Sequence, residues 1–209
     1  MQQNGQESDF YAINLQKRAH QLLASHPATG EDEASGELHV SKDGLCPAAV
    51  LVPIVNRDGE THVLLTKRAD DHPHHAGQIS FPGGKIARED KTIEAAALRE
   101  TLEETGIEPR YIELLGHLDA HKTGTGFTIY PVVALLEPAF DLKPCAREVA
   151  EIFEVPLSFL MNSDNYRIEE MFWRGRAREF YMIDYSVYQI WGATAAILKM
   201  LQERLYKTK

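Results

Sequence analysis

Cysteine, basic charge and long apolar runs are all scarce in this 209-residue sequence. The two cysteines, Cys46 and Cys145, are far apart, which argues against a disulfide framework and favours a reducing compartment. There are 22 basic and 31 acidic residues, a formal net charge of −9, so we expect no broad basic face for nucleic acid or an anionic membrane. Residues 1–30 contain no apolar run typical of a signal peptide or a membrane span. We therefore expect a cytoplasmic protein that binds neither nucleic acid nor membrane.

The chain length fits one domain with an added helix or hairpin. Residues 10–24 carry apolar positions among polar ones and predict a short amphipathic helix, and the following HPATGEDEASGE reads as an acidic loop. The main domain is expected to begin near Leu45. We therefore divide the chain into an N-terminal segment, residues 1–44, and a main domain, residues 45–209.

The first half of the main domain predicts a hairpin and a helix. AAVLVPIVN and THVLLTKR are apolar, β-branched runs separated by RDGE, whose Asp-Gly pair is a hairpin signal. The next segment, ADDHPHHAGQISFPGGK, is too rich in His, Pro and Gly to form one regular element. Thr92 can cap a helix that runs to Thr105, with Gly106 after its last turn and Pro109 preventing continuation.

Strands and helices are mixed in the second half. YIELLGHLDA and FTIYPVVALLE predict strands joined by a flexible HKTGTG, and REVAEIFEVPLSFLM predicts an irregular segment and a turn of helix. YRIEEMFW and EFYMIDY predict two more strands, and residues 187–205 a final helix on which Tyr188 and Trp191 pack into the core rather than stack on a base. Without regular βαβ alternation, this order predicts the α/β (α+β) class, with a mixed sheet between helices.

The segment RETLEETGI, residues 99–107, places Glu100, Glu103 and Glu104 in the last turns of the predicted helix. Carboxylates three and four residues apart repel one another by about 0.2–0.5 kcal/mol per pair. The negative end of the helix macrodipole adds to this cost. Stability alone therefore does not explain why three glutamates occur here.

A helical wheel places the three carboxylates on one face of the helix. The apolar residues opposite them are Ala95, Leu98 and Leu102. We therefore expect the helix to pack on the sheet through this apolar stripe and to present its carboxylates outward, which a merely solvated face would also do. The upstream SFPGGK favours a metal site, because paired glycines turn the backbone sharply and expose a carbonyl oxygen. Oxygen ligands of this kind suit Mg²⁺ or Mn²⁺.

These motifs resemble a known family. Gly84, Asp90, Arg99-Glu100, Glu103-Glu104 and Gly106 together are similar to the Nudix box. Eight residues separate Asp90 from Arg99, where the generic box has seven, and this longer spacing resembles the coenzyme A pyrophosphatase branch. The upstream LLTKRA at residues 64–69, with GQIS and FPGG at residues 77–84, is similar to the signature of the same branch. The sequence departs from the pattern at Asp90, Thr101, Pro73 and Ala87, where glutamate, an apolar residue, arginine and an acidic residue are usual.

The resemblance implies a Nudix-type α/β/α sandwich over residues 45–209. It also implies Mg²⁺- or Mn²⁺-dependent hydrolysis of the diphosphate of coenzyme A and its thioesters, which gives 3′,5′-ADP and 4′-phosphopantetheine products. Glu100, Glu103 and Glu104 would hold the metal together with the Gly84 carbonyl, and Arg99 would orient these glutamates by ion pairing.

The general base would be one of these glutamates or a carboxylate outside the box. Glu148 is our candidate, with Glu151 and Glu154 open as alternatives. The residues expected to contact the substrate are Arg68, Gly83, Gly84 and Lys85. Lys67 alternates to the opposite strand face from Arg68, so we do not expect both to serve.

Three alternatives stay open at this stage. His72, His74 and His75 could form a zinc site, although neither cysteine is close in sequence. The substrate could be another nucleoside diphosphate derivative such as ADP-ribose, or the protein could sense a nucleotide without cleaving it. Homodimers are frequent among the proteins it resembles, and residues 1–40 could contribute to such an interface. The acyl preference, the physiological metal and the effect of Pro73 are not predicted.

Overall fold

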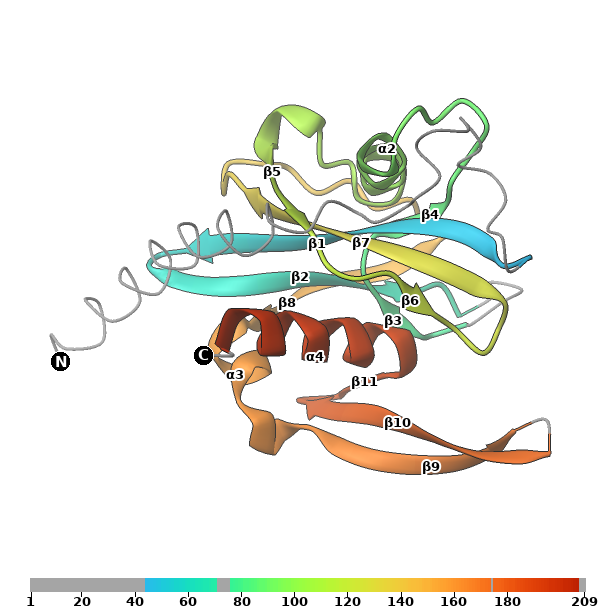
Figure 1. Cartoon of the computed structure of the whole chain (residues 1–209). Helices are drawn as coiled ribbons and strands as arrows, with labels where there is room; N and C mark the ends of the chain where they lie inside the picture. The colour runs from blue at the N-terminus through green and yellow to red at the C-terminus, as the bar shows by residue number, and fades with distance from the viewer. Residues whose placement is uncertain (1–43, 71–75, 174, 207–209) are drawn as a thin grey trace, which may run out of the picture.

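The computed structural model of the chain describes residues 44–70, 76–173 and 175–206. The predicted N-terminal helix, the acidic loop and the three histidines of the zinc alternative lie outside the described residues, as does Pro73. Within the described part of the chain, eight strands form a mixed sheet and three form a smaller antiparallel sheet (Figure 1).

The main sheet is built around a long central strand. Its order is β3 (Ile79–Ser80), β2 (Glu60–Arg68), β1 (Cys46–Arg57), β7 (Phe127–Leu136) and β5 (Ile112–His117). β4 (Gly83–Lys85) pairs with β1, β6 (His121–Lys122) with β7, and β8 (Val149–Pro156) with β2. β1 and β7 are parallel, whereas the other pairs are antiparallel. β1 is almost continuously apolar and buried, as expected for a strand covered on both faces.

The predicted hairpin between the first two strands is confirmed. β1 and β2 pair antiparallel up to Arg57 opposite Glu60. Asp58 and Gly59 form the connection with φ of 52° and 88°. Positive φ at both positions is what a tight two-residue hairpin turn requires, so the Asp-Gly pair fixes the register of the two strands.

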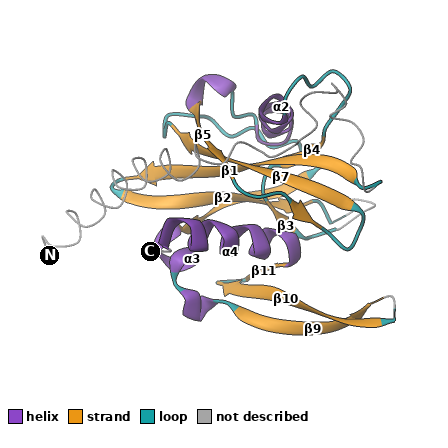
Figure 2. Ribbon diagram, in the orientation of Figure 1, coloured by secondary structure: helices purple, strands orange, loops and turns teal. Residues whose placement is uncertain are grey.

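Helices cover both faces of the main sheet (Figure 2). α2 (Ile93–Thr105) packs on one face, where Ala96 and Ala97 meet Leu51 of β1. α3 (Leu157–Met161) and α4 (Gly192–Tyr206) lie on the other, where Leu198 joins the larger core around Val52. The predicted α/β/α sandwich is therefore confirmed. Among the described helices, none is long and apolar enough to cross a bilayer.

The smaller sheet lies beyond α4 and has the order β11 (Tyr188–Trp191), β10 (Arg176–Tyr185), β9 (Arg167–Trp173). The two strands predicted around YRIEEMFW and EFYMIDY are thereby confirmed. Two short 3-10 helices, η1 (Pro109–Tyr111) and η2 (Ser163–Asn165), precede β5 and β9.

Three local predictions are wrong. The segment expected to be irregular after residue 147 contains strand β8, because Val149–Pro156 pairs with β2 more than eighty residues upstream. Residues 121–122 of the expected flexible connection form β6. The last helix begins at Gly192, so Tyr188 and Trp191 lie on strand β11; their rings contact Phe153 and Phe180 at centroid distances of 3.8 and 5.7 Å.

Candidate metal and diphosphate site

The helix that carries the three glutamates begins and ends where the sequence predicts. The Thr92 hydroxyl accepts a hydrogen bond from the Ala95 N–H at 3.1 Å, and Gly106, at φ 77°, donates its N–H to Leu102 O at 2.9 Å. A Cβ on Gly106 would lie 2.7 Å from the Lys143 Cβ. Glycine is therefore needed here both for the left-handed backbone and for the close approach of the following loop.

The face through which α2 packs differs from the prediction. Leu102 is exposed and Leu98 half-buried, whereas the buried side of the helix carries Ile93, Ala96, Ala97, Thr101, Glu104 and Thr105. The buried hydroxyl of Thr101 donates to Ala97 O at 2.7 Å, which satisfies it within the helix. The carboxylates therefore do not share one outward face: Glu104 is buried against the sheet, Glu100 is mostly buried and Glu103 is half-exposed.

Two consecutive glycines on β4 form the opposing wall. A Cβ on Gly83 would lie 2.4 Å from Ala49 O, so β4 can approach β1 only without a side chain there. The Gly83 N–H donates to Glu104 Oε2 at 3.1 Å. A Cβ on Gly84 would lie 2.5 Å from both Cδ and Oε2 of Glu100. The two glycines thus leave the space into which the carboxylates of α2 project.

Burial raises the pKa of Glu104 to about 7, and the nearby charges of Glu100 and Glu148 add to the rise. The Gly83 N–H and the positive charge of Arg68 oppose it. Burial likewise raises the pKa of Glu100, where Glu103 and Glu148 contribute repulsion and Arg99 opposes it. Carboxylates that repel one another in a partly buried site are stabilised by a cation.

Glu148 reaches this cluster through backbone hydrogen bonds. Cys145 donates its N–H to Glu104 O at 3.0 Å, at the end of α2, and Glu148 donates to Cys145 O at 2.8 Å. The Ala69 N–H at the end of β2 donates to Glu148 O at 2.9 Å. The loop that carries Glu148 is thus tied to both α2 and β2.

The alternative carboxylates on β8 have other partners. Glu151 accepts a hydrogen bond from the Tyr188 hydroxyl. Glu154 forms an ion pair with Arg57 Nη2 at 2.7 Å. Of the three candidates for the carboxylate outside the box, only Glu148 contributes to the electrostatics of both Glu100 and Glu104.

Arg99 lies at the centre of a hydrogen-bond network. Its guanidinium donates to Glu100 Oε1 at 2.8 Å and to Glu103 Oε2 at 3.2 Å, as expected from ion pairing. Buried Asp90 accepts from Arg99 Nε at 3.0 Å and Nη2 at 2.8 Å, and its Oδ2 also accepts from the Ala87 N–H at 2.7 Å. The anchoring of Arg99 by Asp90 was not predicted from the sequence. The acidic residue at this position of the motif could have indicated it.

The remaining predicted residues lie around the cluster. Arg68 ends β2 and is half-buried, close enough for its charge to lower the pKa of Glu104. Lys85 has an exposed side chain, and its backbone carbonyl accepts from Arg99 Nη2 at 3.1 Å. Lys67 lies 3.7 Å from Asp70 in an ion pair. Of Lys67 and Arg68, it is therefore Arg68 that lies near the carboxylates.

The donors of this site suit a hard divalent cation. As they stand, no three His, Cys, Asp or Glu side chains within residues 44–70, 76–173 and 175–206 converge on one point, because Arg99 and the Gly83 N–H take carboxylate oxygens of Glu100 and Glu104. The donor atoms are oxygens only, and the Glu100 carboxylate lies directly against Gly84. This chemistry fits Mg²⁺ or Mn²⁺.

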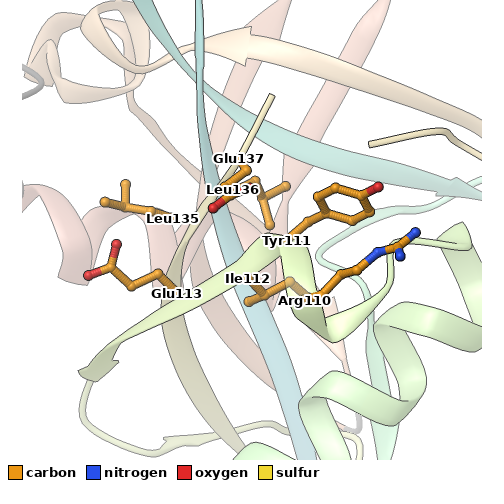
Figure 3. A pocket seen from close by; sticks show the side chains of 7 residues that line it. All are labelled: Arg110, Tyr111, Ile112, Glu113, Leu135, Leu136 and Glu137. Atoms are coloured by element: carbon orange, nitrogen blue, oxygen red, sulfur yellow. The ribbon is translucent and has the colours of Figure 1, made fainter. Parts of the chain in front are cut away.

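A separate pocket lies where β5 begins and β7 ends (Figure 3). Its lining residues are Arg110, Tyr111, Ile112, Glu113, Leu135, Leu136 and Glu137. The Arg110 guanidinium lies 4.8 Å from the centre of the Tyr111 ring and pairs with Glu108 at 2.9 Å. None of the predicted site residues lines this pocket.

Comparisons with known proteins show the family of the chain. The NUDIX domain family matches residues 45–171. An uncharacterized Nudix hydrolase NudL of Enterobacter sp. (strain 638) is 39% identical over 154 residues, 74% of this chain and 80% of the relative. The NudL of Photorhabdus laumondii is 39% identical over 158 residues, 76% of this chain and 84% of the relative. A crystal structure of a C. elegans Ap4A hydrolase is similar at 21% identity and TM-score 0.47, covering 55% of this chain and 82% of that one. From the family match and the identity to these relatives, the chain belongs to the Nudix hydrolase family.

Proposed function

We propose that this protein hydrolyses the diphosphate of coenzyme A and its thioesters, with Mg²⁺ or Mn²⁺, to 3′,5′-ADP and the corresponding 4′-phosphopantetheine. The observation that carries the proposal is the position of the LLTKRA segment. Arg68 brings positive charge to Glu104, and the Ala69 N–H holds the Glu148 backbone. The motif that resembles the coenzyme A branch is therefore part of the carboxylate site.

In this proposal Glu100, Glu103 and Glu104 hold the metal together with the Gly84 carbonyl. When bound, a divalent ion would neutralise phosphate oxygens and lower the pKa of the attacking water. Burial and mutual repulsion of Glu100 and Glu104 favour such an ion, because it removes the cost of two partly buried like charges.

The side chains of the chain itself have separate roles. Glu148 accepts a proton from the water that attacks one phosphorus, and the bond from that phosphorus to the bridging oxygen breaks. Arg68 contacts phosphate oxygens and offsets charge that shifts to them. Arg99, held by Asp90 and the Lys85 carbonyl, keeps Glu100 and Glu103 in place. The Gly83 N–H orients Glu104.

The test is mass spectrometry of the products formed from coenzyme A, acetyl-coenzyme A and ADP-ribose in parallel, with and without a chelator. We expect 3′,5′-ADP from the first two substrates, and loss of product with the chelator or in Glu104→Gln. Cleavage of ADP-ribose but not of coenzyme A would overturn the substrate. Tight nucleotide binding without turnover of any diphosphate would identify a sensor instead.

A matched pair of variants tests the role of Arg68. Arg68→Ala removes the cation beside Glu104, whereas Lys67→Ala removes a neighbouring cation that pairs with Asp70. We expect Arg68→Ala to lower kcat/KM about tenfold or more and Lys67→Ala to change it little. Equal losses in both variants would show that general positive charge, rather than Arg68, serves the substrate.

A further inference from the structure

One basic side chain beside the carboxylate site has no role in holding the loop that carries it. Arg147 directly precedes Glu148 and is exposed. Among all the residues whose positions the structure describes, none forms a hydrogen bond or an ion pair with the Arg147 guanidinium. The net charge of the chain is −9, so an arginine next to a group of carboxylates would ordinarily pair with one of them. Arg147 is instead available to an anionic group of a ligand.

The backbone around Arg147 is fixed by hydrogen bonds on both sides. The Cys145 N–H donates to the last turn of α2 at 3.0 Å, and a backbone N–H at the end of β2 donates to Glu148 O at 2.9 Å. Between these two bonds, Cys145 O accepts from the N–H groups of Glu148 and Val149 at 2.8 and 2.9 Å. The same bonds that place Glu148 at the carboxylate site therefore also place Arg147.

Arg147 lies beside Glu148 rather than behind it. The bond from the Val149 N–H to Cys145 O closes one helical turn, in which consecutive side chains point about 100° apart. Glu148 is close enough to the buried glutamates of α2 for its charge to raise their pKa values. Arg147 therefore borders the carboxylate site on one flank. A ligand bound at the carboxylates can reach Arg147 with a neighbouring group.

Other basic residues that adjoin the site are engaged or point away from it. Arg99 is held by three carboxylates. Lys67 lies on the opposite face of β2 and pairs with an aspartate. Lys85 follows the glycine that meets the carboxylates of α2, so its side chain leaves β4 on the other face. Arg68 accompanies the carboxylates, and Arg147 is the cation on their flank.

We propose that Arg147 binds the 3′-phosphate of coenzyme A and thereby sets a preference for substrates that carry this group. The inference rests on the proposed function. The metal and Arg68 serve the diphosphate, whereas the 3′-phosphate is a separate charged group across the ribose and needs a cation of its own. A guanidinium suits a terminal phosphate, because it donates two parallel hydrogen bonds to the phosphate oxygens.

Steady-state kinetics with coenzyme A and dephospho-coenzyme A, which lacks only the 3′-phosphate, test the proposal. In the parent we expect kcat/KM to be about tenfold or more higher for coenzyme A, mainly through KM, because the 3′-phosphate is bound equally in the ground state and the transition state. Arg147→Ala should lose this preference by lowering kcat/KM for coenzyme A alone. Arg147→Lys should keep part of it, because an ammonium retains the charge but not the paired hydrogen bonds.

Lys143→Ala is the matched control. Lys143 is an exposed cation earlier in the same loop, at the end of α2. This variant should keep the preference of the parent for coenzyme A. A loss of preference as large as that in Arg147→Ala would show that general positive charge on the loop, rather than Arg147, selects the substrate, and would overturn the proposal.

Product binding provides a readout without turnover. Calorimetric titration of the parent should show 3′,5′-ADP binding about tenfold or more tightly than 5′-AMP, which lacks the 3′-phosphate. In Arg147→Ala the two nucleotides should bind with nearly equal affinity. Equal affinities in the parent would overturn the proposal.

The outcomes separate this inference from the proposed function. Equal kcat/KM for the two substrates in the parent, or equal losses on both substrates in Arg147→Ala, would overturn the role of Arg147 and leave coenzyme A hydrolysis intact. Cleavage of ADP-ribose but of neither coenzyme A compound would overturn the proposed function and this inference with it.

Discussion

The carboxylate of Glu100 lies against the α-carbon of Gly84, so that a Cβ at Gly84 would come within 2.5 Å of Glu100 Cδ. Gly84→Ala must therefore displace the carboxylate, while φ at this position is not in the range that requires glycine. We expect kcat to fall about a hundredfold, since a shift of about 1 Å in a catalytic group has that effect. The thermal midpoint should change little, because the flexible end of a side chain can move aside.

The shorter side chain of Glu100→Asp provides a second measurement at the same contact. In the double variant with Gly84→Ala, the shorter Asp side chain should avoid the added methyl. The double variant should therefore lose less activity than the sum of the two single-variant losses, expressed as free energies. Steady-state kinetics of both single variants and the double variant measure this coupling. Strictly additive losses would show that the contact between the Glu100 carboxylate and the new methyl is not the cause of the lost activity.

Asp90→Asn tests the anchor of Arg99. The amide keeps the shape of the side chain but loses the charge that binds two guanidinium nitrogens. We expect kcat to fall about 10- to 100-fold, as is typical when a residue that holds the metal ligands in place is lost. The free energy of unfolding should fall by about 1–3 kcal/mol, less than for a fully buried pair because Arg99 is partly exposed. The neighbouring exposed Glu89→Gln is the control, and equal activity of the two variants would mean that Glu100 and Glu103 suffice to hold Arg99.

The helix α2 shows what the sequence could and could not predict. Its ends depend on local chemistry, a threonine cap and a glycine in left-handed conformation, so both were predicted to the residue. Which face of α2 is buried depends on the part of the sheet that packs against it. Because Gly83 and Gly84 bring β4 close, small and polar residues of α2 face the sheet and Leu102 is left exposed. A wheel based on apolarity alone selects the wrong face.

Non-local pairing accounts for the other differences. β8 carries Glu151 and Glu154 three residues apart, without a period-two pattern, and becomes a strand by pairing with β2, far upstream. Glu148 was a candidate from the resemblance, but its backbone bond to Ala69 depends on this pairing and could not be read from the sequence. Residues 187–191 were taken into the last helix because they are apolar and aromatic, whereas Gly192, at φ 64°, separates β11 from α4.

Metal binding should appear as a gain in stability. Mg²⁺ at about a hundred times its dissociation constant would stabilise the folded protein by about 2.7 kcal/mol. For a chain of this length that corresponds to a thermal midpoint about 5–10 °C higher. Glu104→Gln should abolish this gain, yet be at least as stable as the parent without metal, because burial penalises the charged carboxylate. Glu103→Gln, at a half-exposed position, should retain part of the gain. Equal Mg²⁺ stabilisation of parent and Glu104→Gln would contradict the assignment of Glu104 to the metal.

Glu94 predicts a dependence of stability on acid. His117 Nε2 lies 2.7 Å from Glu94 Oε1, and this contact lowers the pKa of Glu94 from 4.5 to about 2. Since the folded-state pKa is the lower one, the stabilisation is present above pH 4.5 and is lost as the pH falls from 4.5 to about 2. Allowing for partial exposure, we expect Glu94→Gln to lose about 1 kcal/mol near pH 6 and to show a shallower decline in acid. Urea unfolding across this pH range measures it, with the exposed Glu108→Gln as a control expected to change little.

Glutamine variants of Glu148, Glu151 and Glu154 test which of these three carboxylates is the general base. Glu148 lies near both Glu100 and Glu104, so removing its charge should lower kcat about 10²- to 10⁴-fold, the usual contribution of a general base. Glu151→Gln should leave kcat nearly unchanged, because Glu151 accepts a hydrogen bond from Tyr188 instead. Glu154→Gln should lower stability rather than kcat, because Glu154 pairs with Arg57.

The pH dependence of kcat distinguishes a base from a residue that only positions others. In the parent, activity should decline in acid as the base is protonated, and Glu148→Gln should lose this limb of the profile together with the rate. If the variant kept the same acidic limb at a lower rate, another carboxylate would be the base and Glu148 would act through its neighbours. A large loss in Glu151→Gln with Glu148→Gln active would move the base to β8, because Glu151 contacts Tyr188 whereas Glu148 lies near Glu100.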